Sequence, residues 1–406
     1  MKKKNHLFMC QLAVAGFGLL LAASACSLEA PLSPPARPAL VRLEQADYPD
    51  FYDDLGFVNL DYSIGQSLAY LRSLPPEHTF VFGTDRYSKA HMTRSLERFA
   101  ALIQTHPSRR QLDRFIRTNY RVYQSSGRAA THDVLFTGYF QPTLQGSLTP
   151  TAEFRYPVYS RPPDLITIDL SRFSEKYHGQ RLTGRLFGQT FVPYYDRRQI
   201  NSHSGFNPHG AELLWVRNRI DLFFLQVQGS GKVYLTNGQK LYLHYQSSNG
   251  RPYRSIGKLL IDQGKIPRSQ MSMQRIRTYL STHPEEIDAV LGYNPSYVFF
   301  EVVPQGPLGY LEVRLTPGRS LAVDHRVFPM AGLTFADTRK PLIDGSGRIA
   351  AWTACHRFLL CQDTGGAIRG PGRADLFYGS GRYAEIAAGH MQQPGQLYFL
   401  VLKPGP

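Results

Sequence analysis

Two aspartates near the C-terminus have neighbours that would suit acid–base chemistry. Asp363 and Asp375 lie twelve residues apart in a glycine-rich stretch, Gln362 to Gly379. Glycine permits tight turns with positive φ, so short rigid connections could bring both carboxylates to one cleft. The apolar run Leu376 to Tyr378 follows Asp375, and such neighbours raise a carboxyl pKa, which keeps a general acid protonated. The alternative is that both carboxylates simply cap turns.

No other segment has the spacing of a phosphate or metal site. The sequence Gly229 to Lys232 and the C-terminal glycines match neither G-x-x-x-x-G-K-S/T nor G-x-G-x-x-G before a helix. Cys355 and Cys361 form a lone C-x5-C without the second ligand pair of a zinc site. We therefore expect no metal and no cofactor. In an oxidising compartment these two cysteines could form a disulfide, and the sequence leaves that open.

Hydrophobic periodicity predicts two helices followed by a strand-rich chain, an α+β protein that is mainly β. Helical spacing runs from Ser88 to His106 and from Leu112 to Tyr123. A later helical interlude covers Ile256 to Gln263 and Ser272 to Leu280. Runs of β-branched and aromatic residues predict the strands Val134 to Phe140, Phe154 to Tyr159, Leu222 to Gln228, Lys232 to Leu235, Tyr297 to Val303, Leu311 to Leu315 and Leu397 to Leu402.

The N-terminus has the pattern of an export signal. A basic start, Met1 to Lys4, precedes an apolar run that ends at Ala25, and the stretch from Leu12 is too short for the roughly 20 residues of a spanning helix. Small residues directly before Cys26 resemble a lipoprotein processing box. We predict a signal peptide at 1–25, an acylated Cys26 and a proline-rich tether at 26–39. The serine after Cys26 resembles the signal for delivery to the outer membrane, facing the periplasm.

The charge of the chain favours an anionic partner. Removal of residues 1–25 takes three lysines from the 46 basic residues and none of the 31 acidic ones, so the mature charge is 43 − 31 = +12. The predicted export of the protein and the lack of a basic helix argue against nucleic acid as this partner. Cell-wall glycan carries carboxylates and is present in the predicted compartment, although a basic surface can also serve solubility alone.

From about Phe136 onward the chain resembles the membrane-bound lytic murein transglycosylase A family. The resemblance rests on several separate blocks rather than on composition. These blocks are Phe136 to Pro142, Pro193 to Ile200, Trp215 to Val216, Asp221 to Gly231, Tyr253 to Lys258, Asn294 to Phe300 and Ala322 to Asp324.

The resemblance implies a double-psi β-barrel domain with an inserted second β-barrel domain and a few N-terminal helices. It implies that residues 40–143 and 294–406 form the outer domain, which carries the catalytic aspartate. Residues 144–293 would form the inserted, glycan-binding domain.

For function, the resemblance implies a lytic transglycosylase that cuts the β-1,4 bond between N-acetylmuramic acid and N-acetylglucosamine in peptidoglycan glycan strands. It implies 1,6-anhydromuramic acid ends, with Asp375 as sole acid and base and with Asp363 and Asp324 as supporting residues. A hydrolytic muramidase, or a non-enzymatic peptidoglycan-binding lipoprotein, remains the alternative. Six residues in the matching blocks are candidates for glycan binding, and for each of them the alternative is a structural role. They are Thr137, Tyr139, Gln226, Gln228, Ser230 and Tyr253.

Overall fold

The computed structural model describes residues 38–405. The predicted signal peptide, the acylation site Cys26 and nearly all of the tether lie outside the described residues. Within 38–405, none of the helices has the length and apolar character needed to span a bilayer.

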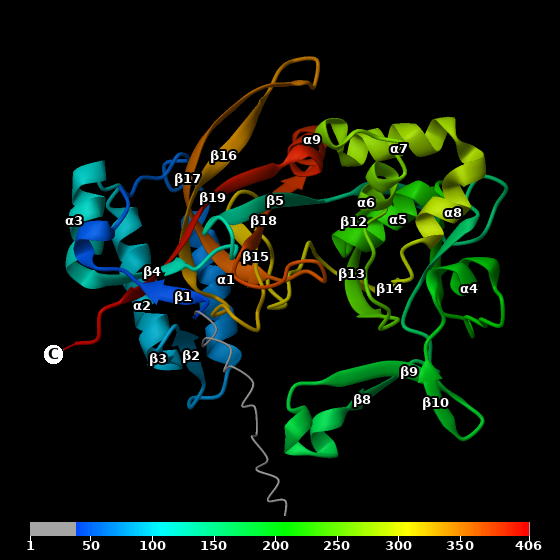
Figure 1. Cartoon of the computed structure of the whole chain (residues 1–406), viewed down its shortest axis with the longest axis horizontal. Helices are drawn as coiled ribbons and strands as arrows, with labels where there is room; N and C mark the ends of the chain where they lie inside the picture. The colour runs from blue at the N-terminus through cyan, green and yellow to red at the C-terminus, as the bar shows by residue number, and fades with distance from the viewer. Residues whose placement is uncertain (1–37, 406) are drawn as a thin grey trace, which may run out of the picture. The chain divides into compact units, whose positions relative to one another are not determined.

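Six strands close into a barrel (Figure 1). They are β5 (Val134–Gln141), β15 (Ser320–Ala322), β16 (Leu333–Ile343), β17 (Ile349–Asp363), β18 (Arg373–Ser380) and β19 (Gln392–Leu402). β5 pairs with both β18 and β19, and the ring continues from β19 through β16, β17 and β15 to β18. The pairs β15 with β17 and β5 with β18 are parallel, and the other pairs are antiparallel. The closed ring confirms the main barrel that the resemblance implied.

The N-terminal part of the described chain covers this barrel. α1 contacts β17, and α2 contacts β19. The part of β19 that does not pair with β5 pairs with β4, and β4 pairs with β1. These elements and a small hairpin are β1 (Leu40–Arg42), α1 (Leu60–Ser73), β2 (Thr79–Phe82), β3 (Asp85–Ser88), α2 (Lys89–Gln104), α3 (Arg109–Asn119) and β4 (Tyr120–Ser125). Serine caps begin both α2 and α3, where Ser88 and Ser108 accept hydrogen bonds from free backbone N–H groups.

Between β5 and β15 the chain forms a second strand-rich part with its own core. Its six-stranded sheet has the order β14, β13, β12, β6, β11, β7. One apolar cluster takes residues from all six strands, and the edge strands β7 and β14 contact each other, so the sheet curls into a barrel. The strands are β6 (Thr143–Ser147), β7 (Tyr156–Tyr159), β11 (Glu212–Val216), β12 (Ser230–Leu235), β13 (Lys240–Ser248) and β14 (Val298–Val303). The last of these strands in the chain ends at Val303.

A smaller sheet and several helices complete this part of the chain. The sheet has the order β10, β9, β8. α7 contacts α9, which follows β18 in the first barrel. The elements are β8 (Ile166–Asp169), β9 (Arg181–Phe187), β10 (Thr190–Pro193), α4 (Arg197–Ser202), α5 (Arg219–Gln228), α6 (Ile256–Asp262), α7 (Met273–Thr282), α8 (Ile287–Gly292) and α9 (Arg382–His390).

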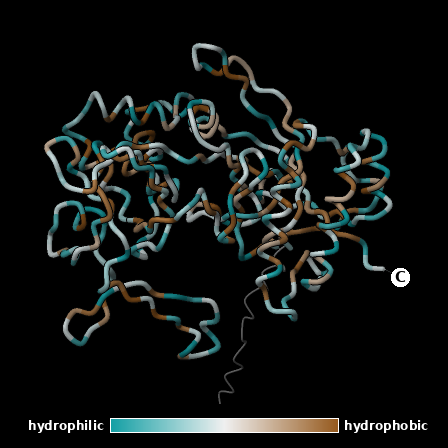
Figure 2. The backbone as a smooth tube through the Cα atoms, turned by 180° about the vertical axis from the view of Figure 1, so that it is seen from behind, coloured by the Kyte–Doolittle hydropathy of each residue, from teal (hydrophilic) through white to brown (hydrophobic). Residues whose placement is uncertain are grey.

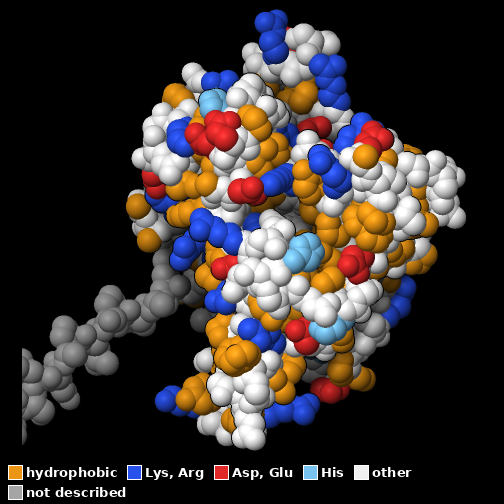
Figure 3. Space-filling view, turned by 90° about the vertical axis from the view of Figure 1, so that its right-hand side faces the viewer, with side chains coloured by type: hydrophobic (Ala, Val, Ile, Leu, Met, Phe, Trp, Pro, Cys, Tyr) orange, Lys and Arg blue, Asp and Glu red, His pale blue; other side chains and the backbone are white. Residues whose placement is uncertain are grey.

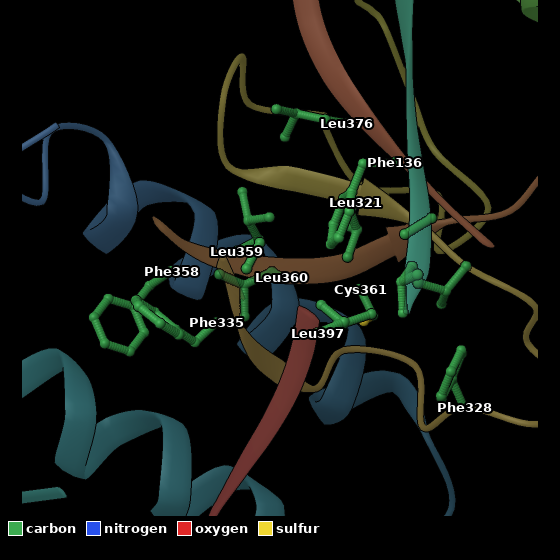
Figure 4. Packing of buried hydrophobic residues seen from close by; sticks show 14 of the residues in the cluster. Phe136, Leu321, Phe328, Phe335, Phe358, Leu359, Leu360, Cys361, Leu376 and Leu397 are labelled. Carbon is green, nitrogen blue, oxygen red and sulfur yellow. The ribbon is translucent and has the colours of Figure 1, made fainter. Parts of the chain in front are cut away.

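The largest apolar core lies around the first barrel and the helices that cover it. Figure 4 shows its centre, where side chains from β5, β15, β16, β17, β18 and β19 meet. Figure 2 shows that hydrophobic and hydrophilic stretches alternate along the backbone. Burying this apolar surface is the main stabilising contribution to the barrel that positions the aspartates.

Three secondary-structure predictions are wrong. The run Leu222 to Gln228 is helix α5, because Asn218 caps its first turn and Gly229, at φ 77°, ends it. The helix predicted to reach Tyr123 ends at Asn119, and the following residues are strand β4. Leu311 to Leu315 form no regular strand, since Glu312 adopts a left-handed φ of 57° that breaks the extended chain.

The disulfide left open by the sequence does not form. Cys355 and Cys361 are both free and buried. They lie on the same strand, β17, and six residues along a strand span about 20 Å. A disulfide needs Cα atoms within about 7 Å, so these two cysteines cannot reach each other.

Candidate active site

The sheet register brings Asp363 and Asp375 to one place. β15 lies between β17 and β18, and Ala322 of β15 is the register partner of both aspartates. Register partners point to the same face, and alternate residues such as Leu321 and Leu376 belong to the main core. The two carboxylates therefore face away from that core, with the short side chain of Ala322 between them.

Asp375 accepts a hydrogen bond from the Thr137 hydroxyl, its register partner on β5. Its second oxygen, Oδ2, accepts no hydrogen bond from the described residues, and the residue is half-buried. Burial raises the pKa of Asp375 to about 6, with the nearby Arg373 lowering it and the charge of Asp363 raising it. This aspartate can thus hold a proton at a pH at which an exposed aspartate has lost it.

Asp363 has a different set of partners. Its Oδ1 accepts backbone N–H groups from Tyr310 at 3.0 Å and Thr364 at 2.8 Å. Burial raises its pKa to about 6, whereas the two N–H groups, the Tyr139 side chain and the charge of His244 lower it. Hydrogen bonds of this kind favour the ionised carboxylate.

Asp324 is fully buried but saturated with donors. Arg326 donates to it at 2.8 and 2.7 Å, and the backbone N–H of Gly370 donates at 2.7 Å. Burial opposes ionisation, yet these donors hold the pKa of Asp324 well below its usual range. Gly370 has φ 71°, which only glycine adopts without strain. Asp324 therefore anchors the loop between Asp363 and Asp375 and is not a proton donor at neutral pH.

β5 supplies two of the predicted site residues. Thr137 and Tyr139 point to the same face, where the Tyr139 ring lies 5.1 Å from that of Phe377. The Tyr139 hydroxyl is buried without a hydrogen-bond partner of normal geometry. Burial and the charges of both aspartates raise its pKa, so it stays a neutral hydroxyl. Gly138 between them is required, because a Cβ there would lie 2.8 Å from the Tyr378 ring.

The other predicted residues lie in the second strand-rich part. Gln226 is buried and accepts from Arg197, and Gln228 accepts from the backbone N–H of Phe140 at 2.9 Å. These hydrogen bonds indicate a structural role for both glutamines. Ser230 begins β12, and Tyr253 is 41% exposed.

Three groups near the aspartates escaped the sequence analysis. Arg373 lies two residues before Asp375 on β18, so strand periodicity alone could have indicated it. His244 and Glu312 come from β13 and from the loop after β14, and their imidazole and carboxylate are 3.3 Å apart. Nothing in the local sequence connects those two segments to the aspartates.

The described residues contain no group of three or more His, Cys, Asp or Glu side chains arranged to hold a metal ion. A cavity of about 770 Å³ lies elsewhere, between α2, α3 and the C-terminal residues, and none of the predicted site residues lines it.

Comparison with known proteins shows which family the chain belongs to. The family model described as the MltA specific insert domain matches residues 135–301, and the model described as the 3D domain matches residues 319–401. The membrane-bound lytic murein transglycosylase A of Vibrio cholerae is 33% identical over 288 residues, which cover 70% of this chain and 69% of that protein. The chain belongs to the membrane-bound lytic murein transglycosylase A family.

Solved structures of this family share the fold. The membrane-bound lytic murein transglycosylase of Agrobacterium tumefaciens has 31% sequence identity and a TM-score of 0.72, with 90% of this chain and 98% of that chain covered. The Escherichia coli MltA with bound chitohexaose has 24% identity and a TM-score of 0.68, over 91% and 96% of the two chains. As a member of the lytic murein transglycosylase A family, the protein is a peptidoglycan lytic transglycosylase.

Proposed function

We propose that Asp375 is the catalytic acid, and then the base, of the transglycosylase reaction. The observation that carries this proposal is the contrast among the three aspartates. Asp324 is held ionised by its donors, and Asp363 is held by two backbone N–H groups. Asp375 combines a raised pKa with an oxygen that accepts no hydrogen bond from the described residues.

The bond cut is the β-1,4 link between N-acetylmuramic acid and N-acetylglucosamine. The Asp375 carboxylic acid gives its proton to the glycosidic oxygen as the bond from that oxygen to C1 breaks. The C6 hydroxyl oxygen of the same muramic acid forms the new bond to C1, and its proton passes to the Asp375 carboxylate. The product has a 1,6-anhydromuramic acid end, and no water is consumed.

An internal nucleophile explains why one acid can suffice. Ordinary glycoside hydrolases use two carboxylates, because one must activate water or attack the sugar. A hydroxyl on the reacting sugar is already held at high effective concentration. Asp363 would then act through its charge, which raises the pKa of Asp375, and Asp324 would hold the connecting loop.

For glycan contacts we propose Tyr139, Ser230 and Tyr253. The Tyr139 hydroxyl is buried beside both aspartates and makes no hydrogen bond of normal geometry, so a sugar hydroxyl or amide could bind it. Tyr253 presents an exposed ring, and aromatic rings combine an apolar face with a polar edge. Thr137 would orient Asp375, and the hydrogen bonds of Gln226 and Gln228 assign those two residues a supporting role.

We also propose that the protein is an outer-membrane lipoprotein that faces the periplasm, acylated at Cys26 after removal of residues 1–25. The small residues before Cys26 and the short apolar run support this assignment, and the names of the relatives describe membrane-bound enzymes. Residues 26–39 would tether the barrels to the membrane.

The test is digestion of purified peptidoglycan by the form that lacks residues 1–26, beside its Asp375→Asn and Asp363→Asn variants. Mass spectrometry of the released muropeptides should find products one water lighter than reducing-end muropeptides. We expect Asp375→Asn to lose activity by at least about a hundredfold, since it cannot donate the proton. Asp363→Asn should retain anhydro products at a reduced rate.

Two outcomes would contradict the proposal. Hydrated products that need both carboxylates would mean a hydrolase, in which Asp363 activates water. Anhydro products from Asp375→Asn at the wild-type rate would show that another group is the acid.

A further inference from the structure

The small sheet of β8, β9 and β10 has one apolar face. Successive residues of a strand point to opposite faces, so Leu182, Gly184 and Leu186 of β9 share one face. Their register partners on β8 and β10 point to the same face and are also apolar. The side chains of this face are Ile166, Ile168, Leu182, Leu186, Phe191 and Pro193.

This apolar face is not part of a core. None of its six side chains belongs to an apolar cluster of residues 38–405. Leu182 is 49% exposed and Leu186 is 59% exposed. Apolar faces of sheets are normally buried against another element. In Figure 1 the three strands project from the rest of the chain.

The opposite face of the sheet is the one that contacts the rest of the chain. The Arg185 guanidinium lies 4.2 Å from the centre of the Tyr195 ring. Gly250 lies so close to Thr183 that a Cβ on this glycine would be 2.6 Å from the threonine side chain. Thr183 and Arg185 alternate with Leu182 and Leu186 along β9, so the apolar face points away from these contacts.

Both ends of the sheet carry exposed aromatic rings. Phe173, in the connection from β8 to β9, is 74% exposed, and Phe187, at the end of β9, is 70% exposed. They are the two most exposed large hydrophobic side chains of residues 38–405. Single exposed apolar residues are ordinary, but a group of them on one element marks an interaction surface.

Cations accompany these apolar side chains. Residues 166–193 contain four basic and two acidic residues, which gives 4 − 2 = +2. Arg172, Lys176 and Arg181 are exposed, and all three lie in or beside the connection that carries Phe173. An anionic partner with an apolar interior would therefore meet both of the groups that it needs.

A lipid bilayer fits this chemistry better than a glycan does. Aliphatic side chains offer no hydrogen bonds to sugar hydroxyls, whereas they enter the boundary between headgroups and acyl chains. Aromatic rings favour the same interface, and Lys and Arg are attracted to anionic headgroups.

The predicted tether would bring the surface to a membrane. Fourteen residues, 26–39, span at most about 50 Å when fully extended. An acyl group on Cys26 would hold the described chain within that distance of the bilayer. A surface that binds lipid weakly then acts at a high effective concentration.

We propose that the apolar face of β8–β10, together with Phe173, Phe187 and the cations beside them, docks on a bilayer with anionic headgroups. The inference rests on the proposed acylation of Cys26, which supplies the nearby membrane. A single tether limits the distance of the protein from the membrane but not its orientation. Docking through the sheet would fix which side of the second strand-rich part faces the lipid.

The test is co-sedimentation of the form that lacks residues 1–26 with vesicles of phosphatidylcholine and phosphatidylglycerol, and with vesicles of phosphatidylcholine alone. This form has no acyl group, so its binding measures the surface itself. We expect binding to the anionic vesicles that high salt weakens. The double variant Phe173→Ser with Phe187→Ser should lose at least about tenfold in vesicle affinity.

Leu342→Ser is the matched control, because Leu342 is 50% exposed on β16, and it should bind the vesicles as the wild type does. The double variant should keep the melting temperature and the activity on purified peptidoglycan, since both rings are exposed. If it does not fold, Arg172→Gln with Lys176→Gln gives the same comparison, with a loss of affinity for the anionic vesicles alone.

Three results would overturn the inference. Wild-type protein that does not sediment with anionic vesicles is the first, and an undiminished vesicle affinity of the double variant is the second. The third is a dimer in sedimentation velocity that the double variant abolishes in the absence of vesicle binding, which would assign the face to a second copy of the chain.

Failure of the proposed function is distinguishable from failure of this inference. It would appear as activity of Asp375→Asn, or as a membrane-purified protein without acyl groups on Cys26. Neither result affects the vesicle affinity of the form that lacks residues 1–26.

Discussion

Asp324, Asp363 and Asp375 are chemically identical side chains with different surroundings. Burial by itself raises the carboxyl pKa of each of the three. Donors then separate them, since Asp324 receives an arginine side chain and two backbone N–H groups, Asp363 two backbone N–H groups, and Asp375 a single hydroxyl. The donors thus separate Asp324, whose pKa is lowered, from Asp363 and Asp375, whose pKa values are both raised to about 6, and Asp375 accepts the fewest hydrogen bonds of the three.

This contrast predicts the effect of Thr137→Val on the basic limb of the kcat profile. The Thr137 hydroxyl donates to the Asp375 carboxylate and favours its ionised form, so removing it should raise the pKa of Asp375. Activity of a general acid is present below its pKa and lost as the pH rises through it. The basic limb should therefore move up by about one pH unit.

Thr137→Ser keeps the hydroxyl and is the matched control for this substitution. It should leave the basic limb where it is in the wild type. A limb that moves down in Thr137→Val, or does not move, would show that Thr137 does not act on the ionisation of Asp375.

At the scale of elements, a buried ion pair joins the segment before α1 to the strands that carry the aspartates. Arg319 donates to both oxygens of Asp53 at 2.6 and 2.8 Å, and both side chains are fully buried. Arg319 also donates to the carbonyls of Val58 and Phe358. Asp53 in turn accepts the backbone N–H of Phe358 on β17. The pair therefore fixes the start of β15 against β17.

We expect Arg319→Met to lower the free energy of unfolding by about 3 to 5 kcal/mol, because it leaves a buried charge without its partner. Denaturant unfolding of the form that lacks residues 1–26 measures this quantity. Arg109→Met is the control, since the Arg109–Asp50 pair is 58% and 80% exposed and should contribute less than about 1 kcal/mol. Equal losses in the two variants would contradict the role assigned to the buried pair.

At the scale of the whole molecule, the chain leaves the first barrel after β5, builds the second barrel, and returns at β15. Hydrogen bonds join the two parts, such as Gln274 to the carbonyl of Glu385 at 2.9 Å. On the face seen in Figure 3, Lys and Arg side chains are spread widely rather than gathered in one patch. A spread of positive charge suits a long anionic polymer better than a compact anion.

The whole protein should carry its anchor at Cys26. We expect the N-terminal peptide of membrane-purified protein to begin at Cys26 and to weigh more than its sequence by the added acyl groups, as mass spectrometry can measure. Two acyl-type attachments hold a protein at a membrane stably, where one is marginal. The control Cys26→Ala should retain residues 1–25 and lack the added mass. A wild-type N-terminus elsewhere in the chain would refute the assignment.

The sequence predicted, with physical reasons, the class of fold, five of the seven strands that it indicated, and the helices α2 and α3. Strand periodicity and serine caps act over a few residues, so they are visible locally. The run Leu222 to Gln228 was wrongly predicted to be a strand, because a short apolar segment fits a buried strand and a buried helix equally well. The helix is favoured by Asn218, which caps its first turn, and by Gly229, which ends it in a left-handed conformation.

By itself the sequence determined which aspartates could matter, because their glycine-rich and apolar neighbours are adjacent in the chain. Only the tertiary structure decided how those aspartates differ. The differences depend on Thr137 and Tyr310, which come from another strand and from a loop and reach the aspartates only when the barrel closes. The pKa of a buried group is set by what lies within a few ångströms in space, and the linear sequence does not show those distances.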